Sequence, residues 1–437
     1  MSDDTFNWDR YLEVAWITDV GMRRATNQDN YNVTLAANLE RWRESGHLFL
    51  VADGMGAHAA GELASEIAAD KIPYLYSKYQ DMSPPEALRQ AVVEGNAEIH
   101  RKGQANEDFY NMGTTCSVLT LLPQGALIAH VGDSRVYRLR DNLLEQLTFD
   151  HSLVWEMRAS GNLSEEDEAS NMVPRNVITR SLGPYPEVKV DLEGPFPIRK
   201  GDTFLICSDG LTGQVTDEEL GPLLANLPVR EAARVLVDLG NLRGGPDNIT
   251  LVIVRVVNDQ LATSTPVNSR PLRVGAKPAK INPLSTGLMI VFGVSALVLW
   301  LISRDWFPAI IPGLIATGSL IWMLVQWSRS FAGGVTLGSG QRFGRGPYTR
   351  TRAISGEQVV GKLETITGEL QKAAVDGKWS IDWNKMNRLV EKANDSIKKG
   401  DQAMAIRCYS RSISFLMDQL REQGNQESGE SRVDPGI

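Results

Sequence analysis

The sequence predicts an α+β fold for its first 258 residues, with antiparallel sheets covered by helices. Two observations lead to this prediction. Apolar runs of strand length are gathered in groups instead of alternating singly with helices, and the helical segments come as two pairs, one after the second strand and one before the last. Two long uncharged runs and a further helical region follow, so the chain of 437 residues holds more than one structural part.

The expected elements follow one another along these first residues. We expect strands at about 12–20, 47–52, 114–122, 126–139, 203–207 and 248–257. We expect helices at about 61–80, 85–103, 217–226 and 229–242. The polar residues 151–175 predict an exposed flap.

Charge divides the chain into two parts. Residues 1–258 carry 23 Lys and Arg against 38 Asp and Glu, a net charge of −15, whereas residues 259–437 carry 22 against 15, a net charge of +7. The total of −8 argues against a dedicated nucleic-acid binder. Three widely separated cysteines exclude a disulfide framework, and the acidic amino terminus without an apolar stretch predicts no signal peptide.

Two uncharged runs predict a membrane hairpin. A basic linker, residues 259–280, leads to the runs 281–303 and 306–328, and each run has 23 residues. A hydrocarbon core of ~30 Å needs about 20 residues of helix. Basic residues on both flanks predict that both termini lie in the cytoplasm and that the protein resides in the inner membrane. A pair of buried helices in a soluble core is the alternative.

The carboxy-terminal part is predicted to be mainly helical. Residues 329–355, rich in Gly and Arg, predict a disordered linker, residues 356–422 a helical region, and residues 423–437 a disordered tail. Within the helical region Lys399-Gly400-Asp401 predicts a helix stop and a new cap. The helices around it resemble a single tetratricopeptide-type hairpin, but a plain bundle is favoured because stable repeat arrays need at least about three units. This region is a candidate binding site for a protein partner.

Aspartates at the ends of the expected strands are the candidate chemical groups. A strand end holds a carboxylate rigidly, and adjacent glycine lets a backbone oxygen or water approach closely. Taken singly, an Asp-Gly pair is more often a turn than a ligand. Several carboxylates brought together repel one another, and multivalent cations offset that repulsion. All-oxygen ligands select hard ions such as Mg²⁺ or Mn²⁺. The aspartates in question are Asp29, Asp53, Asp133, Asp209 and Asp247.

Eight short motifs occur in a fixed order along these residues, and five of the eight contain one of these aspartates. They are Arg24-x-x-Asn27-Gln28-Asp29, Asp53-Gly54-Met55-Gly56-x-His58-x-x-Gly61-Glu62, Met112-Gly113-Thr114-Thr115, Val131-Gly132-Asp133-Ser134-Arg135-x-Tyr137, Leu147-Thr148-x-Asp150-His151-Ser152, Ile178-Thr179-Arg180-Ser181-Leu182-Gly183, Cys207-Ser208-Asp209-Gly210-Leu211-Thr212 and Gly245-Pro246-Asp247-Asn248-Ile249-Thr250. Together they resemble the metal-dependent serine/threonine protein phosphatase family (protein phosphatase type 2C) in its bacterial form. The resemblance covers about residues 9–258 and neither the hairpin nor the tail.

The resemblance implies a four-layer α-β-β-α sandwich of two antiparallel sheets flanked by helices over residues 9–258. Two transmembrane helices and a small helical region would follow it. The resemblance further implies two Mn²⁺ or Mg²⁺ ions at one edge of the sandwich, with a third, weaker ion. A hydroxide between the two ions would attack phosphorus without a phospho-enzyme intermediate.

The resemblance also implies roles for the metal ligands. Asp53 would bridge both ions, and the carbonyl of Gly54 would bind one of them. Asp209 and Asp247 match further ligands, and Asp29 would act through a water molecule.

Three other positions are carried over from the family. Asp133 matches the residue that binds the third ion, and Arg24 matches the arginine that grips the substrate phosphate, to which its fork of donors is suited. Met55 stands where other branches have the histidine acid, so His58 is the nearest candidate for the general acid. A hydrogen bond at a helix start is an equally good explanation of His58, His151 is a weaker candidate, and a metal-bound water is a further alternative.

The resulting hypothesis is a membrane-tethered phosphatase that hydrolyses phosphoserine and phosphothreonine on cytoplasmic proteins and opposes a serine/threonine kinase. The alternative is a catalytically idle, phosphatase-like scaffold that binds phosphoproteins. The presence of Asp53, Asp209 and Asp247 favours catalysis, because a decayed site is expected to lose at least one of them.

Overall fold

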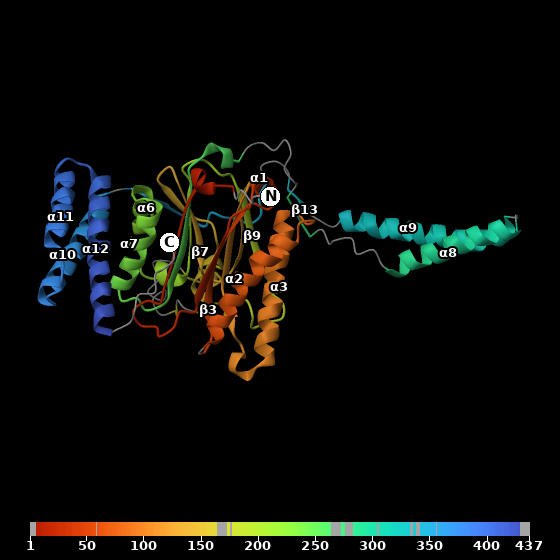
Figure 1. Cartoon of the computed structure of the whole chain (residues 1–437), viewed down its shortest axis with the longest axis horizontal. Coiled ribbons are helices and arrows are strands. Elements are labelled where there is room, and N and C mark those ends of the chain that lie inside the picture. Colours follow the sequence, from red (N-terminus) through yellow and green to blue (C-terminus); the bar gives the residue numbers. More distant parts are fainter. Residues whose placement is uncertain are drawn as a thin grey trace. The chain divides into compact units, whose positions relative to one another are not determined.

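The computed structural model divides the chain into two compact units (Figure 1). The first unit comprises Met1–Lys78, Leu88–Ser269 and Arg342–Ile437, and the second comprises Tyr79–Ala87 and Arg270–Gln341. The residues that the structure describes are 6–57, 59–163, 173–174, 177–263, 272–275, 283–303, 306–332, 335–337, 341–354 and 356–428.

The first unit is built on two antiparallel sheets. One sheet has the order β1 (Leu12–Asp19), β11 (Ile249–Val256), β10 (Thr203–Cys207), β7 (Arg135–Arg140), β8 (Leu143–Gln146), β14 (Thr349–Arg352). The other has the order β2 (Asp29–Thr34), β3 (His47–Met55), β5 (Cys116–Leu122), β6 (Gly125–Val131), β9 (Asp191–Phe196), and β4 (Gly113–Thr114) also pairs with β3.

A continuous apolar core joins the two sheets. Alternate side chains of β3 and β5, such as Phe49 and Leu119, lie in one buried cluster with Phe204, Ile206 and Val252 of β10 and β11. Because successive strand residues point to opposite faces, each strand buries one set of side chains between the sheets. Removing this apolar surface from water is the main stabilisation of a sandwich.

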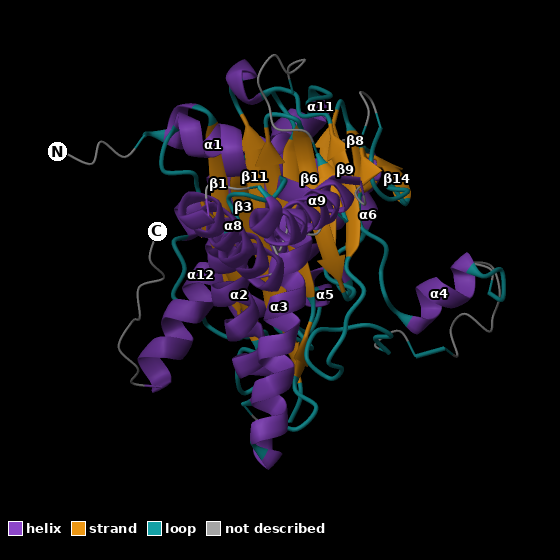
Figure 2. Cartoon of the chain, turned by 90° about the vertical axis from the view of Figure 1, so that its right-hand side faces the viewer, coloured by secondary structure: helices purple, strands orange, loops and turns teal. Residues whose placement is uncertain are grey.

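Helices cover both outer faces of the sandwich, on its left and right sides in Figure 1, and in Figure 2 the helices of one face lie in front of the strands. The helix α2 (Ala60–Lys78) contacts β2 and β3, and α7 (Val229–Leu242) contacts β1 and β11. The neighbours of these two helices are α3 (Pro84–Ala105) and α6 (Asp217–Asn226), and the predicted α-β-β-α layers are therefore confirmed. Shorter helices are α1 (Leu39–Ser45), α4 (Leu153–Ala159) and α5 (Asp209–Thr212), with 3-10 turns at Trp8–Arg10, Glu107–Phe109, Asp259–Leu261 and Phe307–Ala309.

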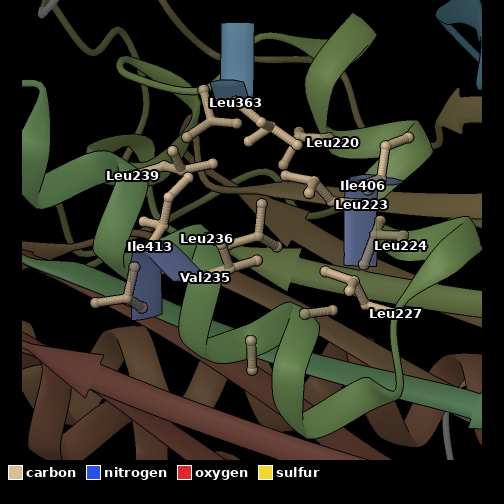
Figure 3. Close-up of a cluster of buried hydrophobic side chains, with 14 of the residues drawn as sticks. Leu220, Leu223, Leu224, Leu227, Val235, Leu236, Leu239, Leu363, Ile406 and Ile413 are labelled. Carbon is tan, nitrogen blue, oxygen red and sulfur yellow. The ribbon is translucent and has the colours of Figure 1, made fainter. Parts of the chain in front are cut away.

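Three carboxy-terminal helices belong to the same unit (Figure 1): the last of them packs against α6 and α7, the first packs against α6, and the middle one packs against the last. They are α10 (Glu357–Asp376), α11 (Trp383–Lys398) and α12 (Gln402–Ser428). Leu363 and Ile406 share one buried cluster with Leu223 and Leu236, as Figure 3 shows. The helices therefore add a fifth layer to the sandwich.

The predicted helix stop is confirmed. The helix α11 ends at Lys398, Gly400 has φ +74°, and the Asp401 side chain accepts a hydrogen bond from the Met404 amide at 3.0 Å. A positive φ favours glycine, and an aspartate is a good cap for the helix that follows.

The structure differs from the sequence-based expectation at residues 349–352. We expected this stretch to be part of a disordered linker, but it forms β14 and pairs with β8 from Thr349↔Gln146 to Arg352↔Leu143. Its alternating Thr and Arg residues are polar and basic, so no apolar pattern marks a strand. The pairing satisfies backbone groups on the edge of β8, which only the tertiary structure provides.

The second unit contains two long helices, α8 (Pro283–Ser303) and α9 (Ile310–Ala332), which pack against each other, and the pair β12 (Arg273–Val274) and β13 (Val335–Thr336). Among the described residues, one helical stretch, Thr286–Ser303, is long and apolar enough to cross a membrane. The apolar stretch at the start of the second helix, Phe307–Met323, is shorter. One candidate span is therefore supported, and the second remains a proposal.

The turn before β14 gives a test of how the carboxy-terminal segment is attached. Gly344 has φ +68°, and a Cβ there would lie 1.9 Å from Oε2 of the buried Glu193. We expect Gly344→Ala to lower the free energy of unfolding by roughly 1–3 kcal/mol, because alanine is strained at positive φ and displaces a buried carboxylate. Thermal unfolding of the purified full chain measures this effect. The control is Gly361→Ala in α10, where a Cβ meets nothing within 4 Å; equal midpoints for the two variants would contradict the expectation.

Candidate active site

The first two aspartates of the site lie opposite each other on neighbouring strands. Asp29 opens β2 and pairs in register with Asp53 near the end of β3. The Ser208 hydroxyl donates a hydrogen bond to Oδ2 of Asp29 at 2.7 Å. The Asp53 amide donates to Oγ1 of Thr115 at 2.9 Å, and the Asp53 carbonyl accepts from the Thr115 amide at 2.8 Å. Asp29 is therefore held at its side chain and Asp53 at its backbone, on two strands that pair with each other.

Gly54 allows three chain segments to meet beside Asp53. Its amide donates to the Gln28 carbonyl at 3.1 Å. A Cβ on Gly54 would lie 2.2 Å from the carbonyl oxygen of Gly61 and 2.4 Å from that of Gln28. No side chain fits at this position, so the end of β3 can approach the start of α2 and the start of β2 closely.

Asp209 and Asp247 come from the ends of two other adjacent strands. Asp209 begins α5 directly after β10, and Asp247 immediately precedes Asn248 and β11. A Cβ on Gly210 would lie 2.0 Å from the carbonyl oxygen of Asn248, so the two segments are in close contact. Arg24 extends its Nη2 to Oδ2 of Asp247 at 2.8 Å, and both side chains are partly exposed.

Asn248 holds the loop that carries Arg24, a role that motif spacing did not reveal. Its Oδ1 accepts from the Gln28 amide at 2.9 Å, and its Nδ2 donates to the carbonyls of Val20 and Thr26 at 2.9 and 3.0 Å. The last motif marks Asn248 as a residue near the site, but it does not identify the hydrogen-bond partners, which are 220 or more residues away in sequence.

Asp133 lies in the turn between β6 and β7. Gly132, with φ +114°, fits against Thr115, where a Cβ would lie 2.5 Å from the threonine Cβ. The Asp133 side chain is buried, and its Oδ1 has no hydrogen-bond partner in the part of the chain that the structure describes. An unpartnered buried carboxylate oxygen is costly, and this one is available to a cation.

Burial raises the pKa of these carboxyl groups, because a buried carboxylate loses hydration. It raises the pKa of Asp29 to about 7, although a hydrogen bond from the neighbouring serine lowers it in part and nearby aspartates raise it again. Burial, and then the charge of Asp209, raises the pKa of Asp133 to about 8. The pKa values of Asp53 and Asp209 are also raised, first by burial and then by another aspartate. The aspartates are thus close enough to repel one another.

The candidate ligands are of the chemical type that a hard cation prefers, because all of them are oxygen donors. A bound cation would also interact with the unpartnered Oδ1 of Asp133 and would reduce the repulsion between the carboxylates. No group of three His, Cys, Asp or Glu side chains within the described ranges is arranged as a ready-made ion cage. The individual ligand assignments are therefore proposals.

The sequence offers two histidines, His58 and His151, as candidates for the general acid. His58 lies outside the described residues. His151 is buried, its Nδ1 accepts from the Gly132 amide at 2.9 Å, and its Nε2 lies 3.0 Å from Oδ2 of Asp191. Because both ring nitrogens are engaged, His151 supports the turn before Asp133 and is not placed to protonate a leaving group.

Comparisons with known proteins agree with this arrangement. The profile of the family described as Protein phosphatase 2C matches residues 23–236. Over 247 residues the chain is 35% identical to protein phosphatase PhpP of Streptococcus pneumoniae, and the match covers 97% of that protein and 56% of this chain. The chain belongs to the protein phosphatase 2C family.

Two further relatives support the assignment to protein phosphatase 2C. The serine/threonine phosphatase stp of Listeria monocytogenes is 37% identical over 248 residues, with 95% of that protein and 56% of this chain covered. The structure of the Streptococcus agalactiae serine/threonine phosphatase superposes with a TM-score of 0.50 at 34% identity, over all of that chain and 56% of this one. The predicted enzyme class, a metal-dependent protein-serine/threonine phosphatase, is thereby confirmed.

The raised carboxyl pKa values predict how the stability of the metal-free phosphatase depends on pH. A group whose folded-state pKa is raised contributes stability that is complete below its unfolded pKa of about 4 and is lost as the pH rises through the folded pKa. For Asp29 and Asp133 that window ends at about 7 and about 8. We therefore expect Asp133→Asn to be more stable than wild type at about pH 8.5 and to gain less on acidification to about pH 5.5.

Unfolding midpoints of the chelator-treated full chain at the two pH values measure this difference. Burial lowers the pKa of His47 and His130 to about 3, which makes the folded protein less stable as the pH falls. Wild type and Asp133→Asn both contain these histidines, so their contribution cancels when the two proteins are compared. Asp376→Asn, at the end of α10, is the control. The same pH dependence in wild type and Asp133→Asn would contradict the expectation.

Proposed function

We propose that this chain is a membrane-tethered phosphatase that removes phosphate from serine and threonine residues of cytoplasmic proteins. The observation that supports this proposal best is that four aspartates from other strand ends lie near enough to Asp53 to raise its pKa, and that the partly exposed Arg24 binds one of them, Asp247. A phosphate monoester is a dianion, and this site combines a place for cations with a fork of hydrogen-bond donors.

The proposed metal ligands are the side chains of Asp53, Asp209 and Asp247 and the carbonyl of Gly54, with Asp29 acting through water. Two Mn²⁺ or Mg²⁺ ions are proposed, and Asp133 is proposed to hold a third, weaker one. When bound, such ions activate water and neutralise charge on a phosphoryl group.

Arg24 is proposed to orient the phosphate. Its Nη2 already lies 2.8 Å from Asp247, and its half-exposed guanidinium has further N–H groups that a phosphate oxygen can accept from. Asn248 supports this role by fixing the loop that carries Arg24. His58 remains the sequence-based candidate for protonating the leaving oxygen of serine or threonine.

The catalytic proposal is tested with the full chain in detergent and a phosphothreonine peptide. We expect Mn²⁺-dependent release of phosphate that falls at least ~100-fold in Asp209→Asn, because that variant removes a proposed ligand. We expect Arg24→Lys chiefly to raise the KM, because lysine cannot make a bidentate contact with phosphate. The proposal fails if wild type is no faster than Asp209→Asn.

The membrane proposal concerns residues 281–328. The apolar stretch Thr286–Ser303 is long enough to span a membrane, and apolar side chains on it such as Leu301 and Ile302 are exposed. The segments that flank the two helices contain basic residues and no acidic ones. We propose that α9 is the second span, that both termini are cytoplasmic, and that a serine/threonine kinase at the same membrane supplies the phosphorylated substrates.

Fractionation of cells tests the tether. We expect the full chain to stay with membranes after washing at high pH, because apolar helices are not released by charge disruption. A chain in which a short Gly-Ser linker replaces residues 264–341 should become soluble and keep the sandwich and its carboxy-terminal helices. The tether is wrong if both chains are found in the soluble fraction.

A further inference from the structure

The segment that follows the helical hairpin, which we call the strap (residues 342–352), is attached to both sheets of the catalytic unit. At the edge of one sheet, the amides of Gly194 and Phe343 donate to each other's carbonyls at 3.2 and 2.5 Å. The buried carboxylate of Glu193 accepts from the Gly346 amide at 3.0 Å and from the Tyr348 hydroxyl at 2.5 Å. At the other sheet the strap becomes β14.

One route leads from the strap toward the active site through Gln146. The Tyr348 amide donates to the Gln146 carbonyl at 2.8 Å, and the Tyr348 ring packs edge-on against Phe149 at 5.5 Å between centroids. The Gln146 side chain is buried, and its Nε2 donates to Oδ1 of Asp150 at 2.8 Å. The strap thus packs on the strand that orients Asp150.

A second route reaches the same place through Asp217. The Thr349 hydroxyl lies 3.5 Å from Oδ2 of Asp217, and Oδ1 of Asp217 accepts from the Tyr137 hydroxyl at 2.9 Å. Tyr137 in turn accepts from Nη1 of Arg135 at 3.0 Å, and Nε of Arg135 donates to Asp150 at 2.9 Å. Both routes end at the ion pair between the partly exposed Arg135 and the buried Asp150.

This ion pair flanks the turn that carries Asp133. Arg135 follows Asp133 by two residues, and His151, next to Asp150, holds both the amide and the carbonyl of Gly132 on the other side of the turn. Residues 135 and 151 therefore hold the backbone on either side of Asp133, and Asp150 contacts the first and is next to the second. In metal sites, groups behind the ligands often control affinity in this way.

The strap lies outside residues 23–236, which the family profile matches. The matches to PhpP and stp take in 97% and 95% of those proteins but only 56% of this chain. Any effect of the strap on the site would therefore be a property that this chain adds to the family fold.

We propose that Tyr348 is a positioning residue. Its ring on Phe149 and its amide on Gln146 hold the segment that carries Asp150, and Asp150 with Arg135 sets the Asp133 turn, so that binding of the weakest cation requires a docked strap. This inference rests on the proposed function in assigning a cation to Asp133. Each contact on these routes joins neighbouring residues, and we propose in addition that cation binding at Asp133 depends on Tyr348.

The test is a Mn²⁺ titration of the full chain in detergent, with free Mn²⁺ followed by electron paramagnetic resonance and phosphate release measured in parallel. We expect Tyr348→Ala to weaken the weakest class of Mn²⁺ binding by about 10-fold and to raise by a similar factor the Mn²⁺ concentration needed for activity. Tyr348→Phe keeps the ring on Phe149 and should restore most of the affinity. Tyr74→Ala, an exposed tyrosine on α2, is the matched control.

The outcomes separate this inference from the proposed function. If Asp133→Asn weakens Mn²⁺ binding and Tyr348→Ala does not, the role of the strap is overturned and the site stands. If Asp133→Asn leaves Mn²⁺ binding unchanged, the inference falls with the third-ion assignment, while hydrolysis that depends on Asp209 can still be observed. Should Tyr348→Ala not fold, Tyr348→Leu removes the aromatic ring and the hydroxyl but still fills part of the space of the side chain, and wild-type Mn²⁺ binding in that variant overturns the proposal.

Discussion

The carboxylates at the candidate active site repel one another, and the rest of the structure must supply the free energy that offsets this repulsion. Asp29 and Asp133 are buried and Asp53 and Asp209 are partly buried, and the loss of hydration together with the neighbouring aspartates raises the pKa of all four. Each comes from the end of a strand whose other residues are fixed in an apolar sandwich, so the stability of the core offsets the cost of the site. A cation would relieve this repulsion, which links the fold to metal-dependent chemistry.

The catalytic unit is discontinuous in sequence, because the chain leaves it after Ser269 and returns at Arg342. The returning part adds a strand to one sheet and three helices to the face formed by α6 and α7. Ion pairs reinforce the apolar contact: Glu219 of α6 binds both Arg243 and Lys362, and the fully buried Asp238 of α7 binds Arg421 of α12. The carboxy-terminal helices are therefore part of the folded enzyme, and the hairpin is an insertion in it.

Sequence reasoning located the aspartates and the main layers because their signals are local. The strand at Thr203–Cys207 and the helices Asp217–Asn226 and Val229–Leu242 have the predicted bounds, since apolar periodicity and turn residues mark them. The polar strand β2 and the basic strand β14 were missed, because their stability comes from a partner edge and not from their own pattern. The roles of Asn248 and Tyr348 were also hidden, since their partners are distant in sequence.

The central claim is that the clustered aspartates hold divalent cations. Equilibrium dialysis of the full chain against Mn²⁺ at about pH 7.5 tests it directly, with Asp53→Asn as the comparison and Asp376→Asn as the control. We expect about two to three bound ions per wild-type chain and per Asp376→Asn chain, and at least one ion fewer in Asp53→Asn. Binding of no more Mn²⁺ by wild type than by Asp53→Asn would contradict it.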